Sequence, residues 1–557
     1  MKLLGKAHDK EFWTEVREKE CYKGFRDSLL YQWEKNKDYT PEVLPYSKFK
    51  LFFTTGSRSE YEGPYFQRRH NLEIAAMLSL IYPDEQKYLD RTMELIYAIC
   101  DEYTWCLPAH QGKLEPFNFN RIDLFASESA YRFAEIYTLL EDRLEPLIKN
   151  RVVYEINRRV VEPFVATENY GWWEKGNMNL TAVCMASVAN TVMLMRPELA
   201  TDAFIARANA SMETFIGGFE EDGMCLEGLG YWGYGFGFFM LYADMVRTFT
   251  EGKVDLFANE KVKTVATFNQ KTVLTGACSL SFADGGEKYT YDIGRMHYLK
   301  NEYPDDILVY DTRYAGSGQG KFCTLLRNVT WRDERYMTEF ADDSVEREYY
   351  APQSQWLIKR NANYGFAAKG GHNSEPHNHN DVGSFIFAKN GKQLICDLGS
   401  GRYCRQYFSG ERYTFLESRS GGHNLPIIDG AEQTYGKDAR AIDVSFENGV
   451  FKLDIAPAYK YEGLNSLVRT FTLEDDCVKL FDDIRYNGRG KILEHLVSRI
   501  EPKLDGGTVT VGECTVTFDP TACKCEIRTV KNSRGGDVYI IEFTLNEGVK
   551  TFACEIK

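Results

Sequence analysis

The sequence predicts a chain of the α+β class, with a helical N-terminal domain followed by a C-terminal antiparallel β-sandwich. Two observations predict this division. From about residue 67 to 269, apolar residues recur every three or four positions, as on one face of a helix. After about residue 345 the apolar period becomes two, as on a strand. The 557 residues allow about two to four domains. We place the helical domain at residues 1–325 and the sandwich at residues 326–557.

The helical period is clearest over residues 122–140, where apolar positions alternate between three- and four-residue spacing. Further helices are predicted at 68–81, 85–103, 144–160, 178–195, 200–217 and 231–250. Short turns such as 82–84 separate them, and consecutive helices with short links pack as antiparallel pairs. Many such pairs in one domain favour a helical toroid or a solenoid.

Strands are predicted at 384–388, 450–455, 477–481 and 537–543, where residues alternate or run apolar. Glycine, asparagine and aspartate turns punctuate this half, and no helical period interrupts it. Many strands joined by tight turns are typical of an antiparallel sandwich. The segment 270–343 fits neither period, and we interpret it as the region where the two halves join.

Composition excludes several classes of protein. The formal net charge is −14 and the pI is about 5.4, which argues against general binding to nucleic acid or to a membrane surface. No apolar run approaches the ~20 residues of a membrane span. Charged residues appear within the first ten positions, so we expect a cytoplasmic protein rather than one with a leader. The 14 cysteines include no C-x-x-C pair and do not indicate a disulfide framework.

The most specific feature is a histidine cluster in the second half. On a strand, residues two apart share a face, so we expect His377 and His379 to point into the same space. Asp397 follows the next apolar strand, and His423 comes later in the chain. Two imidazoles and a carboxylate match a zinc-type ligand set, with water as a fourth ligand. The alternative is a hydrogen-bonded histidine cluster in a turn.

A second cluster, over residues 169–181, combines amides, aromatic residues and glycines before an apolar helix. The adjacent Trp172 and Trp173 favour a surface that stacks on sugar rings, although tryptophan is also a common core residue. Asn177 or Asn179 is equally explained as a helix N-cap. This motif is less specific than the histidine cluster.

A third cluster, over residues 222–237, contains two tyrosines and six glycines. Tyr231 and Tyr234 are three residues apart and share one face if the segment is helical. Gly233, Gly235 and Gly237 would each weaken that helix, so we expect another group to approach the backbone closely. Tight packing between helices explains the glycines equally well.

Other residues are weaker candidates for contact with a ligand. His110 follows a predicted helix at a position suited to lining a cleft. Arg402 and Tyr403 come shortly after Asp397, where a loop beside the metal site would reach a substrate. Glu227, within the third cluster, is a further candidate for substrate binding.

Together the three clusters resemble the heparinase II/III-like family of polysaccharide lyases. The resemblance spans most of the chain and is strongest in Pro376-His-Asn-His-Asn-Asp-Val-Gly-Ser-Phe385 and Asp397-Leu-Gly-Ser-Gly-Arg-Tyr403. It implies an (α/α) toroid joined to an antiparallel β-sandwich, with the active site between the two domains. It also implies β-elimination of uronic-acid glycans that leaves 4,5-unsaturated uronate ends, with glycosaminoglycans favoured.

The resemblance also implies roles for particular residues. His379, Asp397 and His423 match the ligands of the family's metal, usually zinc and mainly structural. His377 matches the catalytic histidine. Asn179 is the one residue that matches the family's amide motif cleanly. The catalytic tyrosine is Tyr231 or Tyr234, with Tyr234 slightly favoured.

The chemistry explains why these residue types are needed. Elimination removes the proton at C5 of the uronate, beside a carboxylate that already carries negative charge. Amide or imidazole donors aimed at this carboxylate stabilise the charge that develops, a role suited to Asn179 and His377. Tyrosine, with an ordinary pKa of about 10, is a poor base at neutral pH unless a neighbouring cation or imidazole lowers that pKa. Otherwise histidine must serve as the base.

Three other functions remain open from the sequence. A toroid hydrolase acting on uronyl oligosaccharides would need two carboxylates across the sugar, for which Asp222 and Glu227 are the candidates. A cupin-like metalloenzyme would use His377 and His379 as joint ligands. A non-catalytic glycan-binding protein would use the aromatic residues. The expected partner is an anionic oligosaccharide, and the oligomeric state is open, a homodimer included.

Overall fold

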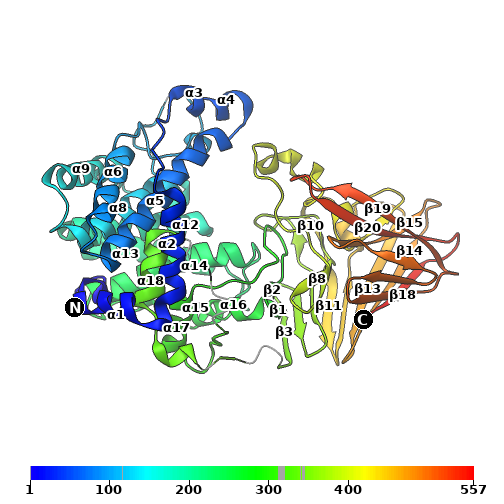
Figure 1. Ribbon diagram of the computed structural model, residues 1–557. Helices are drawn as coiled ribbons and strands as arrows, with labels where there is room; N and C mark the ends of the chain where they lie inside the picture. Colours follow the sequence, from blue (N-terminus) through cyan, green and yellow to red (C-terminus); the bar gives the residue numbers. More distant parts are fainter. Residues whose placement is uncertain (1, 116, 312–315, 317–319, 339, 342–344) are drawn as a thin grey trace. The chain divides into compact units, whose positions relative to one another are not determined.

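The computed structural model describes residues 2–115, 117–311, 316, 320–338, 340–341 and 345–557 (Figure 1). The chain divides into two compact units. The helical unit contains residues 1–219, 233–266 and 291–341, and the sheet unit contains residues 220–232, 267–290 and 342–557. Two short segments, 220–232 and 267–290, therefore lie between parts of the helical unit in sequence but belong to the sheet unit. The single boundary predicted between residues 325 and 326 stays a prediction.

The helical unit contains the long helices that the sequence predicted. Its described helices are α1 (Lys10–Glu18), α2 (Lys23–Asn36), α3 (Tyr46–Phe49), α4 (Leu51–Thr55), α5 (Ser59–Ile81), α6 (Gln86–Cys100), α7 (Pro108–Gln111), α8 (Leu124–Leu140), α9 (Pro146–Ile156), α10 (Glu162–Val165), α11 (Gly171–Glu174), α12 (Asn179–Met195), α13 (Asp202–Gly217), α15 (Glu260–Ala266), α17 (Ile293–Glu302) and α18 (Phe322–Thr330). Helix α14 (Leu229–Phe249) begins in the sheet unit and continues in the helical unit. All seven predicted helices are confirmed; α5 begins nine residues before its predicted start at residue 68, and the ends of the others shift by a few residues.

Two helices of this unit show how the sequence sets their limits. Helix α8 begins after Asp123, whose carboxylate accepts a hydrogen bond from the backbone N–H of Ala126 at 2.8 Å. Helix α12 is apolar on nearly every side, and most of its side chains are buried. A helix that is apolar all round belongs in the centre of a domain.

The sheet unit is built from antiparallel strands. They are β1 (Val273–Thr275), β2 (Cys278–Ser279), β3 (Arg347–Ala351), β4 (Trp356–Arg360), β5 (Gly365–Lys369), β6 (His372–Asn373), β7 (Phe385–Lys389), β8 (Lys392–Ile395), β9 (Pro426–Ile428), β10 (Gly436–Arg440), β11 (Ile442–Glu447), β12 (Val450–Asp454), β13 (Leu464–Leu473), β14 (Val478–Tyr486), β15 (Ile492–Ser498), β16 (Lys503–Asp505), β17 (Thr508–Val511), β18 (Cys514–Phe518), β19 (Cys523–Lys531), β20 (Asp537–Leu545) and β21 (Thr551–Ile556). The short helix α16 (Phe268–Lys271) precedes β1.

The described strands form three larger sheets. The first has the order β11-β12-β13-β14-β21-β18-β17-β16, the second β19-β20-β15-β9, and the third β3-β4-β5-β7-β8. Along β14, buried and more exposed residues alternate, so one face of its sheet points into the protein. The four predicted strands correspond to parts of β7, β12, β14 and β20 and are confirmed.

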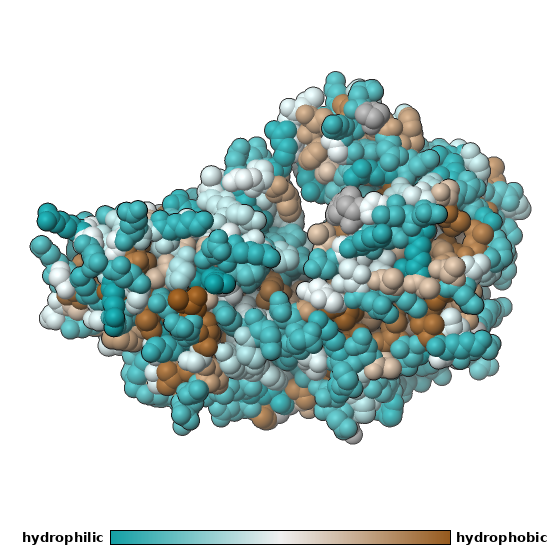
Figure 2. All heavy atoms as spheres, turned by 180° about the vertical axis from the view of Figure 1, so that it is seen from behind, coloured by the Kyte–Doolittle hydropathy of each residue, from teal (hydrophilic) through white to brown (hydrophobic). Residues whose placement is uncertain are grey.

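The apolar core of the sheet unit lies between these sheets. Phe366 of β5, Phe385 of β7 and Phe471 of β13 meet with ring centroids 5.2 to 6.0 Å apart. On the face shown in Figure 2, by contrast, hydrophilic side chains predominate and apolar ones are scattered. None of the described helices has the length and apolar character of a membrane span.

Candidate active site and metal centre

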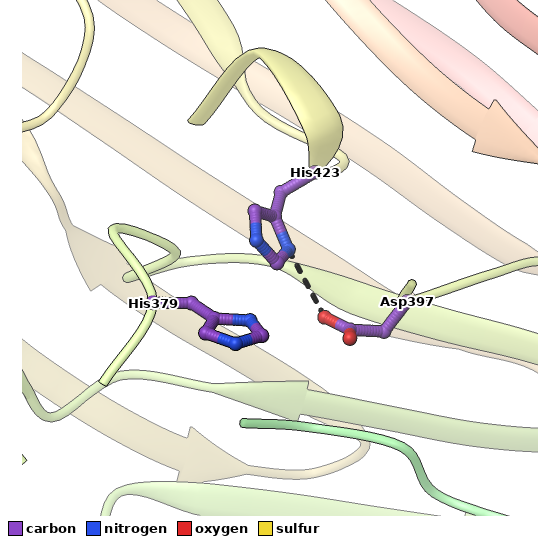
Figure 3. A group of neighbouring side chains, drawn as sticks. All are labelled: His379, Asp397 and His423. Carbon is purple, nitrogen blue, oxygen red and sulfur yellow. Dashed lines mark hydrogen bonds and ion pairs between the residues drawn. The ribbon is translucent and has the colours of Figure 1, made fainter. Parts of the chain in front are cut away.

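A buried cluster in the sheet unit brings together the three predicted metal ligands. His379, Asp397 and His423 have fully buried side chains, and one potential ligand atom from each lies within 4.8 Å of the others (Figure 3). They come from three segments: the loop after β6, the end of β8 and the turn before β9. The predicted grouping of these residues is therefore present in the folded chain.

Both ring nitrogens of His423 face hydrogen-bond acceptors. Its Nε2 lies 2.9 Å from the carbonyl oxygen of Glu417, which only accepts, so Nε2 carries a proton. Its Nδ1 lies 3.0 Å from Oδ2 of Asp397, also an acceptor. A second proton or a metal cation must separate these two atoms. Burial favours the neutral ring, but the charge of Asp397 outweighs it and raises the pKa of His423.

His379 fits the same interpretation. Its Nε2 lies 3.2 Å from Oδ1 of Asp284, and its Nδ1 is buried without a hydrogen-bond partner among the described residues. An unpartnered buried nitrogen is costly, and metal coordination would satisfy it. Two imidazole nitrogens and one carboxylate oxygen are a donor set suited to zinc, and the other ring nitrogen of each imidazole faces a carbonyl or carboxylate oxygen. The residues therefore fit a divalent metal.

Asp284 links this cluster to the predicted catalytic histidine. Its carboxylate is fully buried, and its oxygens face five partners. Those partners are His377 Nδ1 at 2.5 Å, His379 Nε2 at 3.2 Å, Tyr403 Oη at 3.0 Å, Tyr407 Oη at 2.7 Å and Arg412 Nη2 at 3.0 Å. Burial alone would raise its pKa, but hydrogen bonds from the two histidines and the charge of Arg412 hold the pKa well below the usual range.

His377 is held in an unusual backbone conformation. Its φ is +54°, in the left-handed region that costs most residues about 1–2 kcal/mol. Arg412 Nη2 donates to its carbonyl oxygen at 2.8 Å, which helps to hold this turn. The strand predicted over His377 and His379 is wrong, because β6 ends at Asn373 and these residues lie in a turn and loop. They nevertheless share a partner, Asp284.

Around the imidazole of His377 lie two groups from the third sequence cluster. The ring of Tyr231 lies over it, with centroids 4.2 Å apart and an angle of 33° between the planes. Oε2 of Glu227 lies 3.4 Å from its Nε2. Because Asp284 accepts the Nδ1 proton, Nε2 faces Tyr231, Glu227 and the partly open side of the cluster, where 22% of the His377 side chain is exposed.

A chain of hydroxyls runs from Tyr231 to the same carboxylate. Tyr403 donates to Asp284 Oδ2, so its oxygen accepts from the hydroxyl of Tyr231, 2.9 Å away. Burial raises the pKa of both phenols above their ordinary value, and the charge of Asp284 raises it further. Both hydroxyls are therefore protonated at neutral pH, and Tyr231 is suited to donate a proton rather than to accept one.

Glycines allow the segments of this site to approach. At Gly399, where φ is +59°, a Cβ atom would lie 2.2 Å from the carbonyl oxygen of Gly285. At Gly228, where φ is +95°, a Cβ would lie 3.1 Å from the Cα of Gly285. The loop that carries Asp284 can therefore pack against both neighbouring segments only because these positions lack side chains.

The other predicted catalytic residues belong to the helical unit. Asn179 is the first residue of α12, is buried, and is not the N-cap, which is Met178. A Cβ at Gly235 would lie 1.9 Å from Asn179 Oδ1, and one at Gly237 would lie 2.7 Å from a guanidinium nitrogen of Arg295. The glycines of α14 thus admit side chains from two neighbouring helices, which confirms the expected close approach.

Tyr234 has a different environment from Tyr231. Its hydroxyl donates to Glu128 of α8, and the same carboxylate forms an ion pair with Lys321. The ammonium group of Lys321 lies 4.9 Å from the centroid of the Tyr234 ring. Burial and the charge of Glu128 raise the pKa of Tyr234 well above its ordinary value, so this phenol is also protonated.

The predicted sugar-binding residues of the helical unit have structural partners. Trp173 is 3% exposed, and its indole N–H donates to the carbonyl of Ile122 at 3.0 Å. This burial contradicts the predicted stacking on sugar, while the side chain of Trp172 lies outside the described residues. His110 stacks on Phe125 and lies 2.7 Å from Asp123, the residue that caps α8. It is nevertheless partly exposed.

Sequence reasoning missed Asp284 and Tyr407. Asp284 lies in the segment that fitted neither apolar period, and an aspartate before two glycines is typical of an ordinary turn. Tyr407 lies in a run of short 3₁₀ turns, where neither period marks a buried residue. Only the folded chain brings them to the histidines.

Solved structures of similar architecture include heparinase III, which is 14% identical, with 93% of this chain and 78% of that chain covered and a TM-score of 0.62. A heparan sulfate lyase HepC mutant from Pedobacter heparinus is 11% identical, with coverage of 98% and 92% and a TM-score of 0.58. The Streptomyces coelicolor A3 chondroitin AC lyase, in complex with chondroitin sulphate, is 11% identical, with coverage of 98% and 82% and a TM-score of 0.55.

This chain has the heparinase III fold. The predicted fold class, an (α/α) toroid followed by an antiparallel β-sandwich, is confirmed, and the resemblance to the heparinase-type lyases holds at the level of fold. No family model and no curated protein matches the sequence. Because identity to the solved structures is below 15%, the heparinase III fold alone does not assign an activity to this chain.

Proposed function

We propose that this protein is a polysaccharide lyase that cleaves uronic-acid glycans by β-elimination. The observation that carries the proposal is the arrangement of His377 between Asp284 and Tyr231 in the sheet unit. It supplies an oriented imidazole and a protonated phenol side by side, as elimination requires. The lyases among the solved structures of similar fold support the same reaction class.

His377 is the proposed base. Because Asp284 accepts the proton on Nδ1, the lone pair of Nε2 is directed away from the carboxylate and can take the C5 proton of a uronate. The electrons of the C5–H bond form the C4–C5 double bond, and the bond from C4 to O4 breaks. Imidazole suits this task because it exchanges protons near neutral pH.

Tyr231 is the proposed acid. Its raised pKa keeps the hydroxyl protonated, and in the resting site that hydroxyl donates to Tyr403. In the reaction it donates instead to the departing O4. The imidazole then holds one extra proton and the phenol lacks one, and their contact allows a return transfer that restores both groups. No water is consumed.

Three further groups have proposed supporting roles. Glu227 lies beside Nε2 of His377 and would meet a hydroxyl of the bound sugar. A divalent metal, for which zinc is proposed, would be held by His379, Asp397 and His423 and would stabilise the loops that carry the site. The amide of Asn179, in the helical unit, stays the predicted donor to the uronate carboxylate.

The substrate class is proposed from the chemistry of the reaction. An acidic glycosaminoglycan-type oligosaccharide is the proposed partner, because the reaction requires a 4-linked uronate. A cytoplasmic location stays a prediction and favours imported oligosaccharides over long polymers.

The structure gives little support to the alternative hydrolase. Its proposed carboxylate pair includes Asp222, which accepts hydrogen bonds from the backbone N–H and the hydroxyl of Ser354 at 2.8 and 2.7 Å. A carboxylate occupied in this way is not placed to activate water. Joint ligation by His377 and His379 is also disfavoured, because His377 is not part of the buried ligand group.

The decisive experiment follows ultraviolet absorbance during incubation with uronate oligosaccharides. A lyase raises absorbance in the band of 4,5-unsaturated uronates, a hydrolase lowers it on unsaturated substrates, and a binding protein leaves it unchanged. His377→Ala should abolish the rise while the protein stays folded by circular dichroism. A rise of unchanged rate in that variant would remove His377 from the mechanism.

A further inference from the structure

A pocket lies in the sheet unit, beside the loop that carries Tyr403. Its volume is about 540 Å³. Three segments form its wall: residues 402–406, residues 414–419, and the end of β19 with the turn that leads to β20. Ser533 of that turn ties the segments together, since its Oγ accepts from the N–H of Arg402 and donates to Glu417.

The pocket carries an excess of positive charge. Arg402, Arg419 and Lys531 line it, and none of the described lining residues is acidic. Arg419 pairs with Glu432, and Lys531 pairs with Asp537 at 2.6 Å. Within the described part of the chain, however, Arg402 has no ion pair. The pocket therefore presents the positive charge of Arg402 to solvent, although the net charge of the whole chain is −14.

Neighbouring residues add to this charge. Arg405 lies between two pocket-lining residues and is exposed, and Arg534 follows Ser533. Nη2 of Arg534 donates only to the neutral oxygens of Ser400 and Gly401, at 3.1 and 2.9 Å. Among the residues that the structure describes, neither arginine pairs with a carboxylate. The buried Glu417, whose Oε1 accepts from Ser533, offsets only part of this charge.

We propose that this pocket binds an anionic group of the glycan, a sulfate ester or a uronate carboxylate, outside the sugar that is cleaved. Guanidinium groups recognise such planar or tetrahedral oxyanions through paired hydrogen bonds. Arg402 is adjacent in sequence to Tyr403, whose hydroxyl bonds both Tyr231 and Asp284. Under this proposal, a glycan with one uronate at His377 places the anionic group of another of its sugars at Arg402. This inference rests on the proposed function.

Binding, rather than turnover, tests the pocket separately from the lyase reaction. The parent protein for this test is the full-length chain carrying His377→Ala, and the double variant carries Arg402→Ala and Arg405→Ala in addition. Calorimetry measures the affinity of each for a sulfated uronate hexasaccharide. Loss of charge-assisted hydrogen bonds should weaken binding about tenfold or more. Added salt should weaken binding less steeply in the double variant. Both side chains are exposed, so stability should change little.

Two controls complete the experiment. Arg489→Ala removes an exposed arginine from another part of the sheet unit and should leave affinity unchanged. A desulfated hexasaccharide with the same backbone shows which anion the pocket binds. If the arginine substitutions weaken binding tenfold for both hexasaccharides, the anion is a carboxylate. If they weaken binding only for the sulfated hexasaccharide, the anion is a sulfate. Equal affinities of the double variant and Arg489→Ala, or no binding by the parent protein, would overturn the inference, whether or not the lyase assay succeeds.

Discussion

Nδ1 of His377 lies 2.5 Å from Oδ2 of Asp284, and the other oxygen of this carboxylate faces the predicted metal ligand His379 at 3.2 Å. One buried carboxylate therefore orients both histidines. The proposed base and the proposed metal centre share a single residue, which makes Asp284 the most informative position to change.

Asp284→Asn should lower kcat by about 100- to 10,000-fold. The amide that replaces the carboxylate presents an N–H to His377, which then favours the tautomer with its proton on Nε2. That nitrogen can no longer accept the C5 proton. Initial rates on uronate oligosaccharides measure the effect, and Asp438→Asn, at an exposed position of β10, is the control. A rate within threefold of the parent enzyme would show that Asp284 does not position the base.

Tyr231→Phe should cost about 100-fold or more in kcat, because the ring over His377 remains but the proton donor is lost. Tyr234→Phe should cost less activity, since its hydroxyl is bonded to Glu128 in the helical unit. This order reverses the slight preference for Tyr234 drawn from the sequence. Rates of the two variants at saturating substrate decide between them, and a larger loss in Tyr234→Phe would restore the original assignment.

His423→Ala should lower both metal content and melting temperature. The change removes a predicted ligand and leaves the buried Asp397 without its partner, a loss of about 3–5 kcal/mol for a broken buried pair. Metal content by elemental analysis separates the two effects, and chelation of the parent protein should lower its melting temperature as well. His495→Ala, which removes another buried histidine of the sheet unit, is the control. Unchanged metal content in His423→Ala would exclude it as a ligand.

The sequence predicted the helices and strands because their apolar periods are regular over many residues. Helix α6 and strand β14 show this clearly, since buried residues recur every three or four positions along α6 and alternate with more exposed ones along β14. Periodicity and composition carry this kind of information well. That His379, Asp397 and His423 form one ligand group was implied by the resemblance to the heparinase II/III-like family, which the motifs around these residues carry.

The local geometry of the site could not be predicted from the sequence. His377 and His379 share a partner, yet they do so from a left-handed turn rather than from a strand. Asp284 reaches them from a segment without periodicity, through close approaches at Gly228 and Gly399. Such contacts depend on how distant loops pack, which no local pattern encodes.

Stability should fall on acidification because of His297 in the helical unit. Burial and the nearby charge of Arg332 lower its pKa from 6.5 to about 4, against the attraction of Asp333. The neutral ring is therefore favoured in the folded state. This contribution is complete above pH 6.5 and is lost as the pH falls to 4, a change of about 3 kcal/mol.

Denaturant unfolding at pH 7 and pH 4.5 measures this effect by comparison with His297→Asn. Asparagine keeps an acceptor for the backbone N–H of Asp333, which bonds His297 Nδ1 at 3.0 Å, but does not titrate. The variant should lose less stability than the parent protein between the two pH values. Equal losses would show that His297 is not responsible.

Gly235→Ala should destabilise the helical unit even though alanine is the better helix former. Its Cβ would lie 1.9 Å from Oδ1 of Asn179 and 3.0 Å from a ring carbon of Phe215. Such overpacking costs about 1–3 kcal/mol, which exceeds the gain of about 0.5–1 kcal/mol from replacing glycine. Gly24→Ala in α2, where no atom lies within 4 Å of the added Cβ, should instead gain stability. Unfolding free energies of the two variants should therefore change in opposite directions, and a gain in Gly235→Ala would contradict the contact with Asn179.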